Sequence, residues 1–246
     1  NLIRRIILEP SGGTFTAKRA PEEQDREFLA STDIWFRPAQ VTTGPDGALW
    51  IVDMYRFLME HPIWILPDRL TELDPRAGDQ MGRIYRVVNR KAQHPAPAIP
   101  PTRKTAWAGL LASQNGVQRD LAHQAIVESQ LVSGAEEIRQ IAQHSQVAAA
   151  RSQALCVLDG LDLLDSSIVK GALNDLNDGV KQQAIRLAEK LDPISPAMAH
   201  QISRFAKEKT PSHLQRQLAY SIGKLELPEG AQHIARLLNQ NKDFPY

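Results

Sequence analysis

The chain has 246 residues, of which 42% are hydrophobic and 23% charged. Its 29 Lys and Arg residues balance 28 Asp and Glu residues, so the formal net charge is +1 and nucleic acid is excluded as an expected partner. No apolar run of about 18 residues occurs, which excludes a membrane span in this piece, and a single Cys excludes an intrachain disulfide and a Cys-based metal cage.

The first part of the chain, residues 1–92, is expected to form antiparallel β-structure. It begins at Asn1 without an initiator Met or a signal-peptide pattern, which suggests a piece of a longer protein. Strand-like runs at 2–8 and 14–19 flank Pro10-Ser11-Gly12-Gly13, whose glycines permit the positive φ of a hairpin turn. A first β-hairpin is therefore predicted here.

Further strands are predicted toward the end of this part. Residues 40–43 and 48–53 flank a Pro-Asp-Gly turn, and residues 82–88 are rich in β-branched and aromatic side chains. The long connection 54–81 exceeds a hairpin loop and is expected to lie over one face of the sheet, with function or short helices of its own. The strands amount to about one blade of sheet, which is a poor independent domain because its face and edges stay exposed.

Composition changes near residue 94, and the proline-rich segment 93–101 is interpreted as a linker. The sequence pattern of residues 102–246 predicts paired helices in a HEAT-like α-solenoid, with a repeat of about 30 to 35 residues. A basic residue, an Ala three positions later and an apolar residue three positions after that recur at Arg119/Ala122/Ala125, Arg151/Ala154/Val157, Lys181/Ala184/Leu187 and Arg216/Ala219/Ile222. The Ala is expected at a close helix contact, and the basic residue is expected to pair with carboxylates or helix ends. Partner helices are predicted at residues 102–113, 135–144, 166–174, 196–207 and 229–239.

Four segments of the first part together carry a resemblance to a known family. They are EFLASTDIWFRP at 27–38, GPDGALWIVDMYR at 44–56, EHP at 60–62 and GRIYRV at 82–87. They resemble the end of the β-propeller in PVC-type haem-binding proteins, a membrane-bound dehydrogenase family. In that family a propeller similar to glucose or sorbosone dehydrogenases precedes HEAT repeats and a c-type cytochrome domain. The resemblance implies an α+β multidomain chain in which a partial propeller is followed by the solenoid.

The chain departs from that family in two respects. It supplies about one blade where a propeller closes with about 4 to 8, and it lacks the Cys-x-x-Cys-His haem attachment motif because Cys156 stands alone. No cofactor is expected in this piece, whereas the resemblance implies pyrroloquinoline quinone and haem c in the parent protein and a periplasmic or otherwise extracytoplasmic location. The implied partners are the missing blades and cytochrome c domain of the same parent chain, and a carbohydrate substrate.

Candidate ligand-binding residues cluster before and after the predicted strand 48–53. Aromatic rings can stack on sugars or planar cofactors, and Arg and carboxylate groups can hydrogen-bond hydroxyls. The candidates are Trp35, Arg37, Asp53, Tyr55, Arg56, Glu60 and His61. The alternative is structural: Arg37 and Asp53 pin the loop as a pair, and Trp35 is a core residue. No catalytic residue is assigned.

Other titratable residues have structural interpretations beside chemical ones. His61 could act as a general base or metal ligand, but without a second His at ligand spacing a loop-anchoring hydrogen bond is favoured. The acidic residues of the long connection match no calcium-loop spacing and are expected on a solvated surface. Cys156 is expected to be a small core residue rather than a reactive thiol, and no metal site is predicted.

Two functions from different classes remain open. In the first, the chain is a fragment of an extracytoplasmic sugar or alcohol dehydrogenase-like protein, whose solenoid spaces a propeller from a cytochrome c module. The fragment alone is then expected to show no turnover. In the second, it is a non-catalytic HEAT-repeat scaffold for protein–protein interaction.

Overall fold

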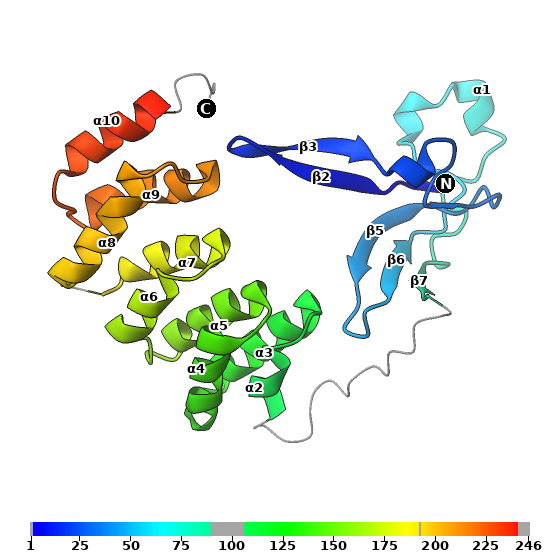
Figure 1. The fold of residues 1–246 in the computed structure, drawn as a ribbon. Coiled ribbons are helices and arrows are strands. Elements are labelled where there is room, and N and C mark those ends of the chain that lie inside the picture. The colour runs from blue at the N-terminus through cyan, green and yellow to red at the C-terminus, as the bar shows by residue number, and fades with distance from the viewer. Residues whose placement is uncertain (1, 90–105, 192, 241–246) are drawn as a thin grey trace. The chain divides into compact units, whose positions relative to one another are not determined.

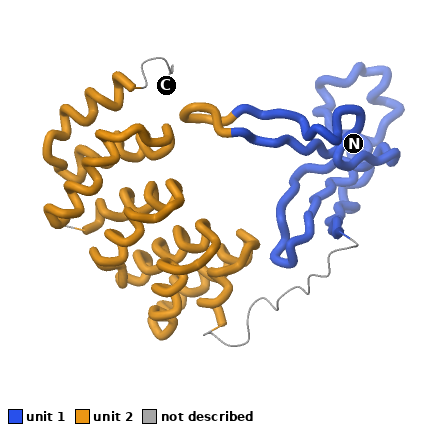
Figure 2. The backbone as a smooth tube through the Cα atoms, viewed as in Figure 1, with its two compact units in different colours: residues 1–9, 16–97 blue, residues 10–15, 98–246 orange. Residues whose placement is uncertain are grey.

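The structure is a computed structural model that describes residues 2–89, 106–191 and 193–240. In these ranges the chain is mixed α+β, with small antiparallel sheets first and helices after them (Figure 1). It divides into two compact units, residues 1–9 with 16–97 and residues 10–15 with 98–246 (Figure 2). We call them the β unit and the helical unit and describe each by itself. The predicted linker 93–101 lies outside the described residues.

The strands form three small sheets rather than one. They are β1 (Leu2–Ile3), β2 (Ile6–Ser11), β3 (Thr14–Arg19), β4 (Leu29–Ala30), β5 (Pro38–Thr43), β6 (Leu49–Asp53) and β7 (Arg83–Val87). β1 pairs with β4, β2 pairs with β3, and β6 lies between β5 and β7 in a three-stranded antiparallel sheet. The predicted strand 2–8 is therefore divided in two. The break falls at Arg4 and Arg5, whose side chains turn to carboxylates of residues 22–27.

The turn between β5 and β6 is fixed by Asp46 and two glycines. The Gly44 N–H donates to the Ala48 carbonyl at 2.8 Å, and Gly47 has the positive φ of 78° that favours glycine. The Asp46 carboxylate accepts from the Ala48 N–H at 3.1 Å and from the Trp50 indole at 3.2 Å. Burial raises the pKa of Asp46, but hydrogen bonds from Arg86 and the Ala48 N–H bring that pKa below its ordinary value.

The connection from β6 to β7 contains two short helical turns, which the sequence analysis named as one alternative. They are η2 (Pro62–Trp64) and α1 (Pro67–Leu70), and each has a proline in its first turn, where the missing N–H costs nothing. This connection carries strongly exposed apolar side chains: Ile63 is 74% exposed, Trp64 82% and Leu66 72%.

The buried apolar side chains are unevenly divided. Among the described residues, the β unit buries Ala20, Phe36, Ala48 and Ile51, whereas the helical unit holds a continuous core from Ala108 to Leu237. The β unit exposes many large apolar side chains instead, including Leu8 at 62% and Ile84 at 67%. Taken by itself, the described part of the β unit supplies no second layer of the kind that a β-sheet needs to bury an apolar face.

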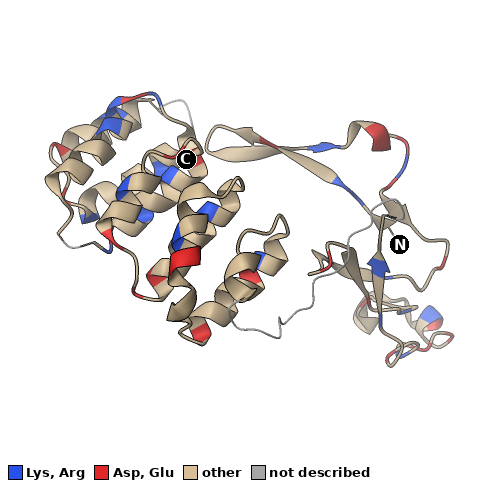
Figure 3. Cartoon of the chain, turned by 60° about the horizontal axis from the view of Figure 1, so that its bottom comes forward, with Lys and Arg blue, Asp and Glu red and all other residues tan. Residues whose placement is uncertain are grey.

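Helices fill the described part of the chain after residue 105. They are α2 (Ala106–Leu110), α3 (Gly116–Glu128), η3 (Val132–Gly134), α4 (Ala135–His144), α5 (Ala148–Gly160), α6 (Ser166–Ala172), α7 (Asp178–Ala188), α8 (Pro196–Lys207), α9 (Ser212–Lys224) and α10 (Gly230–Gln240). α3, α5, α7 and α9 contact one another in sequence, and each packs against the even-numbered helix before it. The predicted helices at 135–144, 166–174, 196–207 and 229–239 agree with these bounds within two residues. The helix predicted at 102–113 is shorter, since α2 ends at Leu110, and its residues 102–105 lie outside the described residues. Figure 3 shows acidic and basic residues interspersed over these helices.

Side-chain caps begin several of these helices. Asn115 accepts from the Val117 N–H, and Asn177 accepts from the Gly179 N–H. Ser195 accepts from the Met198 N–H at the start of α8, just before a proline at the first helical position. Such caps satisfy N–H groups that have no partner inside the helix.

Burial of the motif alanine is confirmed in three helices and wrong in the fourth. The motif alanines Ala122, Ala154 and Ala184 are all fully buried, but Ala219 of α9 is exposed. The buried residues of α9 are Leu214, Gln215, Leu218, Ser221 and Ile222, so its buried face lies one residue earlier than the motif predicts. The basic residue at 216 produced the error, because an amide occupies the equivalent position.

In three of the four helices, a side chain at the first position of the motif ties the helix to the segment before it, whereas Lys181 of α7 pairs with Asp178 of its own first turn at 2.8 Å. Arg119 donates to the Ser113 carbonyl at 2.8 Å, and Arg151 donates to the Ser145 carbonyl at 2.6 Å. In α9 it is Gln215 that donates in this way, to the Thr210 carbonyl at 2.9 Å. The expectation that the basic residue pairs with carboxylates or helix ends is met for Arg119, Arg151 and Lys181, and in α9 the neutral amide Gln215 takes this position in place of Arg216.

Candidate functional site

The candidate site begins where β6 ends, at Asp53. Its side chain is buried, and Oδ1 accepts from the Arg37 N–H at 2.7 Å and from the Tyr55 N–H at 2.9 Å. The Met54 N–H donates to the Arg37 carbonyl at 3.0 Å, so the two strand ends are tied at several points. Asp53 Oδ2 is buried without a hydrogen-bond partner among the described residues. The structural alternative of an Arg37–Asp53 pair is thus realised through the backbone N–H of Arg37.

The Arg37 side chain extends this tie to the long connection. Its guanidinium donates to the Phe36 carbonyl at 3.3 Å and to the Phe57 carbonyl at 3.2 Å. The pKa of the exposed Glu60 carboxyl is lowered by hydrogen bonds from its own N–H and the Met59 N–H, with a smaller effect from the positive charge of Arg37. The main role of the Arg37 guanidinium is therefore to hold backbone carbonyls in place, rather than to bind a ligand as a cation.

The aromatic candidates stack on one another. The Trp35 ring centroid lies 5.7 Å from that of Tyr55 and 5.8 Å from that of Phe57, and the Arg83 guanidinium carbon lies 3.5 Å from the Tyr55 centroid. A Cβ on Gly78, whose φ is +85°, would collide with the Tyr55 carbonyl and crowd the Trp35 ring. The last part of the connection 54–81, at Gly78, therefore packs closely against this aromatic cluster. Trp35 itself is only half-buried.

The remaining candidates anchor the connection. The Arg56 guanidinium donates to the Arg76 carbonyl at 3.4 Å. His61 precedes η2, and its Nδ1 accepts from the Ile63 N–H at 3.2 Å, so the ring caps this short helix. Trp35, Arg37, Asp53 and Tyr55 therefore lie together, whereas Arg56 and His61 act elsewhere along the connection.

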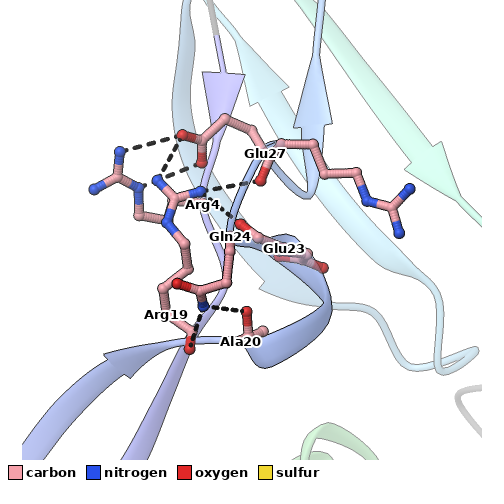
Figure 4. Close-up of polar contacts among 7 residues, drawn as sticks. Arg4, Arg19, Ala20, Glu23, Gln24 and Glu27 are labelled. Carbon is pink, nitrogen blue, oxygen red and sulfur yellow. Dashed lines mark hydrogen bonds and ion pairs between the residues drawn. The ribbon is translucent and has the colours of Figure 1, made fainter.

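A charged cluster that the sequence analysis did not identify fixes the other end of the β unit (Figure 4). Glu27 Oε1 accepts from Arg4 at 3.2 Å and from Arg19 at 2.9 Å, and these two hydrogen bonds, Arg4 first, lower its pKa. Arg19 also donates to the Glu23 carbonyl at 2.9 Å. The signal in the sequence is the set of adjacent charges at 4–5, 22–23 and 26–27, which gives no indication of which pairs meet.

The helical unit has an open groove of about 680 Å³ across α3, α5 and α7. Cys156 lines it and is half-buried rather than in the core, which corrects the expectation for this residue. Burial raises the pKa of its thiol, so the unreactive interpretation stands. Three of the polar side chains in the groove bind one another: Gln153 accepts from Arg119 at 3.3 Å and donates to Asp120 at 2.7 Å.

The described residues of the two units contain neither a metal-binding cluster nor a membrane-spanning helix. There, no group of three or more His, Cys, Asp or Glu side chains is placed to hold a metal ion. No described helix is long and apolar enough to cross a bilayer. The cofactors implied by the resemblance fit poorly: haem c needs two cysteines, and the Trp35 and Tyr55 rings that a quinone would stack on already contact each other and Arg83.

Residues 1–91 match a family described as a domain of unknown function (DUF7133), and this range contains the whole candidate site. No curated protein matches the chain, and no solved structure matches it either. The family description assigns no activity.

Proposed function

We propose that the β unit is a sector of a larger β domain in an extracytoplasmic sugar or alcohol dehydrogenase-like protein related to the PVC-type family. The observation that carries this proposal is the deficient core of the β unit. Four buried apolar side chains cannot offset the chain entropy of more than 80 ordered residues, whereas its exposed apolar side chains would gain stability from a covering partner. The open edges of the three-stranded sheet favour the same interpretation, a propeller blade beside further blades.

In this proposal the helical unit is a HEAT-like spacer. Its two rows of helices share one core, so it is stiffer than a coil linker of the same length and can hold a second module at a fixed separation. That module would be a cytochrome c domain that accepts electrons from the β domain. This chain's own residues position backbone in the β unit, and no catalytic step is assigned to them.

The coding sequence on both sides of these residues tests the proposal. We expect several further blade-like segments before residue 1 and a Cys-x-x-Cys-His motif after residue 246. The chain incubated with pyrroloquinoline quinone, candidate sugars and an artificial electron acceptor should show no turnover. Catalysis by the chain alone would contradict its role as a sector.

A non-catalytic scaffold is the second candidate function, and the contacts that the candidate site residues make favour it. Asp53, Arg37 and His61 each bind backbone groups rather than lining a cavity. A start codon near Asn1 and a stop codon after Tyr246 would support this candidate over the first.

A further inference from the structure

The open groove of the helical unit crosses three consecutive helices of one row. α3 contacts α5 and α5 contacts α7, so the three helices lie side by side (Figure 1). Neighbouring helices that pack in this way are about 8–10 Å apart. Ala148, Ala149 and Gly179 are among the lining residues, and such small side chains leave room for a ligand. The groove is therefore a cavity with a regular repeat along its length.

Each of the three helices contributes to the groove one polar side chain that makes no hydrogen bond within the described residues. These are His123 of α3, Ser152 of α5 and Gln182 of α7, and all three are half-buried. Ser152 and Gln182 occupy equivalent positions of their helices, 30 residues apart. His123 lies one helical turn after Asp120, which holds the equivalent position in α3. Hydrogen-bonding groups thus recur once per helix along the groove.

The lining of the groove carries one charge of each sign, and neither is unoccupied. Arg119 and Asp120 are both hydrogen-bonded to Gln153, and Arg119 also donates to the Ser113 carbonyl at 2.8 Å. Burial lowers the pKa of His123, which the negative charge of Asp120 opposes, so this ring is neutral near pH 7. The electrostatics of the groove therefore fit an uncharged ligand.

The chemistry of the lining favours a peptide among uncharged elongated ligands. Sugar sites commonly present aromatic rings for stacking, and no Phe, Tyr or Trp is among the described residues that line this groove. His123, Ser152 and Gln182 each carry a donor and an acceptor. The main chain of a peptide offers matching carbonyl and N–H groups at regular intervals.

We propose that this groove binds a proline-rich peptide in the polyproline II conformation, with one turn of the peptide over each of α3, α5 and α7. Polyproline II has three residues per turn and a rise of about 3.1 Å, which gives a repeat of about 9.3 Å. That repeat agrees with the spacing of packed helices, whereas a β-strand repeats about every 6.6 Å. The same side of the peptide thus meets each helix in turn.

The conformation also leaves the peptide ready to bind. Polyproline II makes no internal hydrogen bonds, so its carbonyl groups remain available to the donors of His123, Ser152 and Gln182. Because proline fixes φ, little conformational entropy is lost on binding. The inference rests on residues of the helical unit alone and does not depend on the dehydrogenase proposal.

Fluorescence anisotropy of a dye-labelled proline oligomer of about 12 residues, four turns of polyproline II, tests this site. We expect saturable binding to the full chain, with a dissociation constant that rises on the order of tenfold or more in Ser152→Arg, because a guanidinium then fills the middle of the groove. Ser166→Arg is the matched control, since Ser166 is an exposed serine of α6 that does not line the groove.

A second variant removes a hydrogen bond without adding bulk. Gln182→Ala should weaken binding of the proline oligomer by about two- to tenfold, the worth of one hydrogen bond. Gln140→Ala, at an exposed position of α4, should leave the affinity unchanged. Circular dichroism of all four variants checks that each is folded.

Three outcomes would overturn the proposal. The first is that the full chain does not bind the proline oligomer up to millimolar concentration. The second is that Ser152→Arg and Gln182→Ala bind as tightly as the unaltered chain, which places the binding on another surface. The third is that maltohexaose, or a glycine–serine peptide of equal length, displaces the labelled oligomer as well as unlabelled oligomer does. In that case the groove recognises sugars or any uncharged chain rather than polyproline II.

Discussion

In the β unit, two carboxylates, those of Asp53 and Glu27, each hold separate segments of the chain together. Asp53 accepts two backbone N–H groups where β6 ends, and Glu27 accepts two guanidinium groups where β1 and β4 pair. Each joins segments distant in sequence at a point where few apolar contacts could do so. Asp53 and Arg37 were predicted as ligand-binding candidates, with a structural pair as the alternative, and the two residues are hydrogen-bonded. Sequence analysis could not predict that the bond uses the backbone N–H of Arg37, because the choice between backbone and guanidinium depends on how the strand ends approach.

Asp53→Ala should loosen the end of β6. The Arg37 and Tyr55 N–H groups would lose their shared acceptor in a buried place, which costs about 2–4 kcal/mol of local stability. Amide hydrogen exchange of Arg37 and Tyr55 should accelerate strongly, with little change in the helical unit. Asp79→Ala, on the exposed part of the long connection, is the control and should change neither amide. Unchanged protection in Asp53→Ala would show that other bonds hold this turn.

Arg151 should be the most sensitive cation of the helical unit. It makes a two-pronged contact with Asp175 at 2.6 and 2.7 Å, and both side chains are largely buried. Arg151→Ala leaves that carboxylate without its cation and should lower the free energy of unfolding by about 1–3 kcal/mol in urea titrations. Arg139→Ala breaks a 4.0 Å pair between the half-buried Arg139 and the exposed Glu136, and should change the free energy of unfolding by less than about 0.5 kcal/mol. Equal effects of the two substitutions would contradict this ranking.

At the scale of elements, helices were easier to predict than strands. The helical repeat pattern located helices such as α4 and α8 to the residue, because this signal is local to each helix. Strand pairing depends on distant segments, so the division of residues 2–8 between two sheets had no local signal. The fourth motif failed for a related reason: basic residues mark a helix surface only approximately, and which of two adjacent positions is buried depends on the packed neighbour.

The docking of α10 should depend on pH through His233. This ring is 1% exposed, and neither nitrogen has a well-formed hydrogen bond within the described residues. Burial chiefly, with the charges of Lys207 and Arg236, lowers the pKa of His233, which Glu229 opposes. The folded chain therefore binds the proton less well than the unfolded chain, whose His pKa is about 6.5. Stability is complete above that value and falls as the pH drops below it.

The size of this pH effect on the free energy of unfolding can be measured and compared with a control variant. Between about pH 6.5 and the lowered pKa of His233 in the folded chain, the free energy of unfolding should fall by up to about 1.4 kcal/mol per pH unit. His233→Leu should flatten this part of the profile, whereas His200→Gln at an exposed position should preserve it. A wild-type profile as flat as that of His233→Leu would show that His233 is not held neutral by its surroundings.

At the scale of the whole molecule, the two units differ in how they are stabilised. The helical unit has one continuous core through nine described helices, and each helix adds to an interface already formed. The β unit relies on turns, charged clusters and small aromatic contacts, with its larger apolar side chains exposed. Composition predicted this division of the chain into a β part and a helical part. It could not predict how little the β part would bury, because burial depends on what surrounds the sheets.

The difference in burial predicts unequal stability of the two units within one chain. Amides in β5, β6 and β7 should exchange at least about tenfold faster than amides in α5 and α7, because opening a sheet with little core exposes little apolar surface. Limited proteolysis should accordingly cut the β unit first and leave a fragment that contains α3 to α9. Hydrogen exchange with mass spectrometry on the intact chain measures both units in one sample, so the helical unit is the internal control. Equal protection of the two units would mean that the β unit is stable as it stands, and the proposal that it needs a covering β domain would then be wrong.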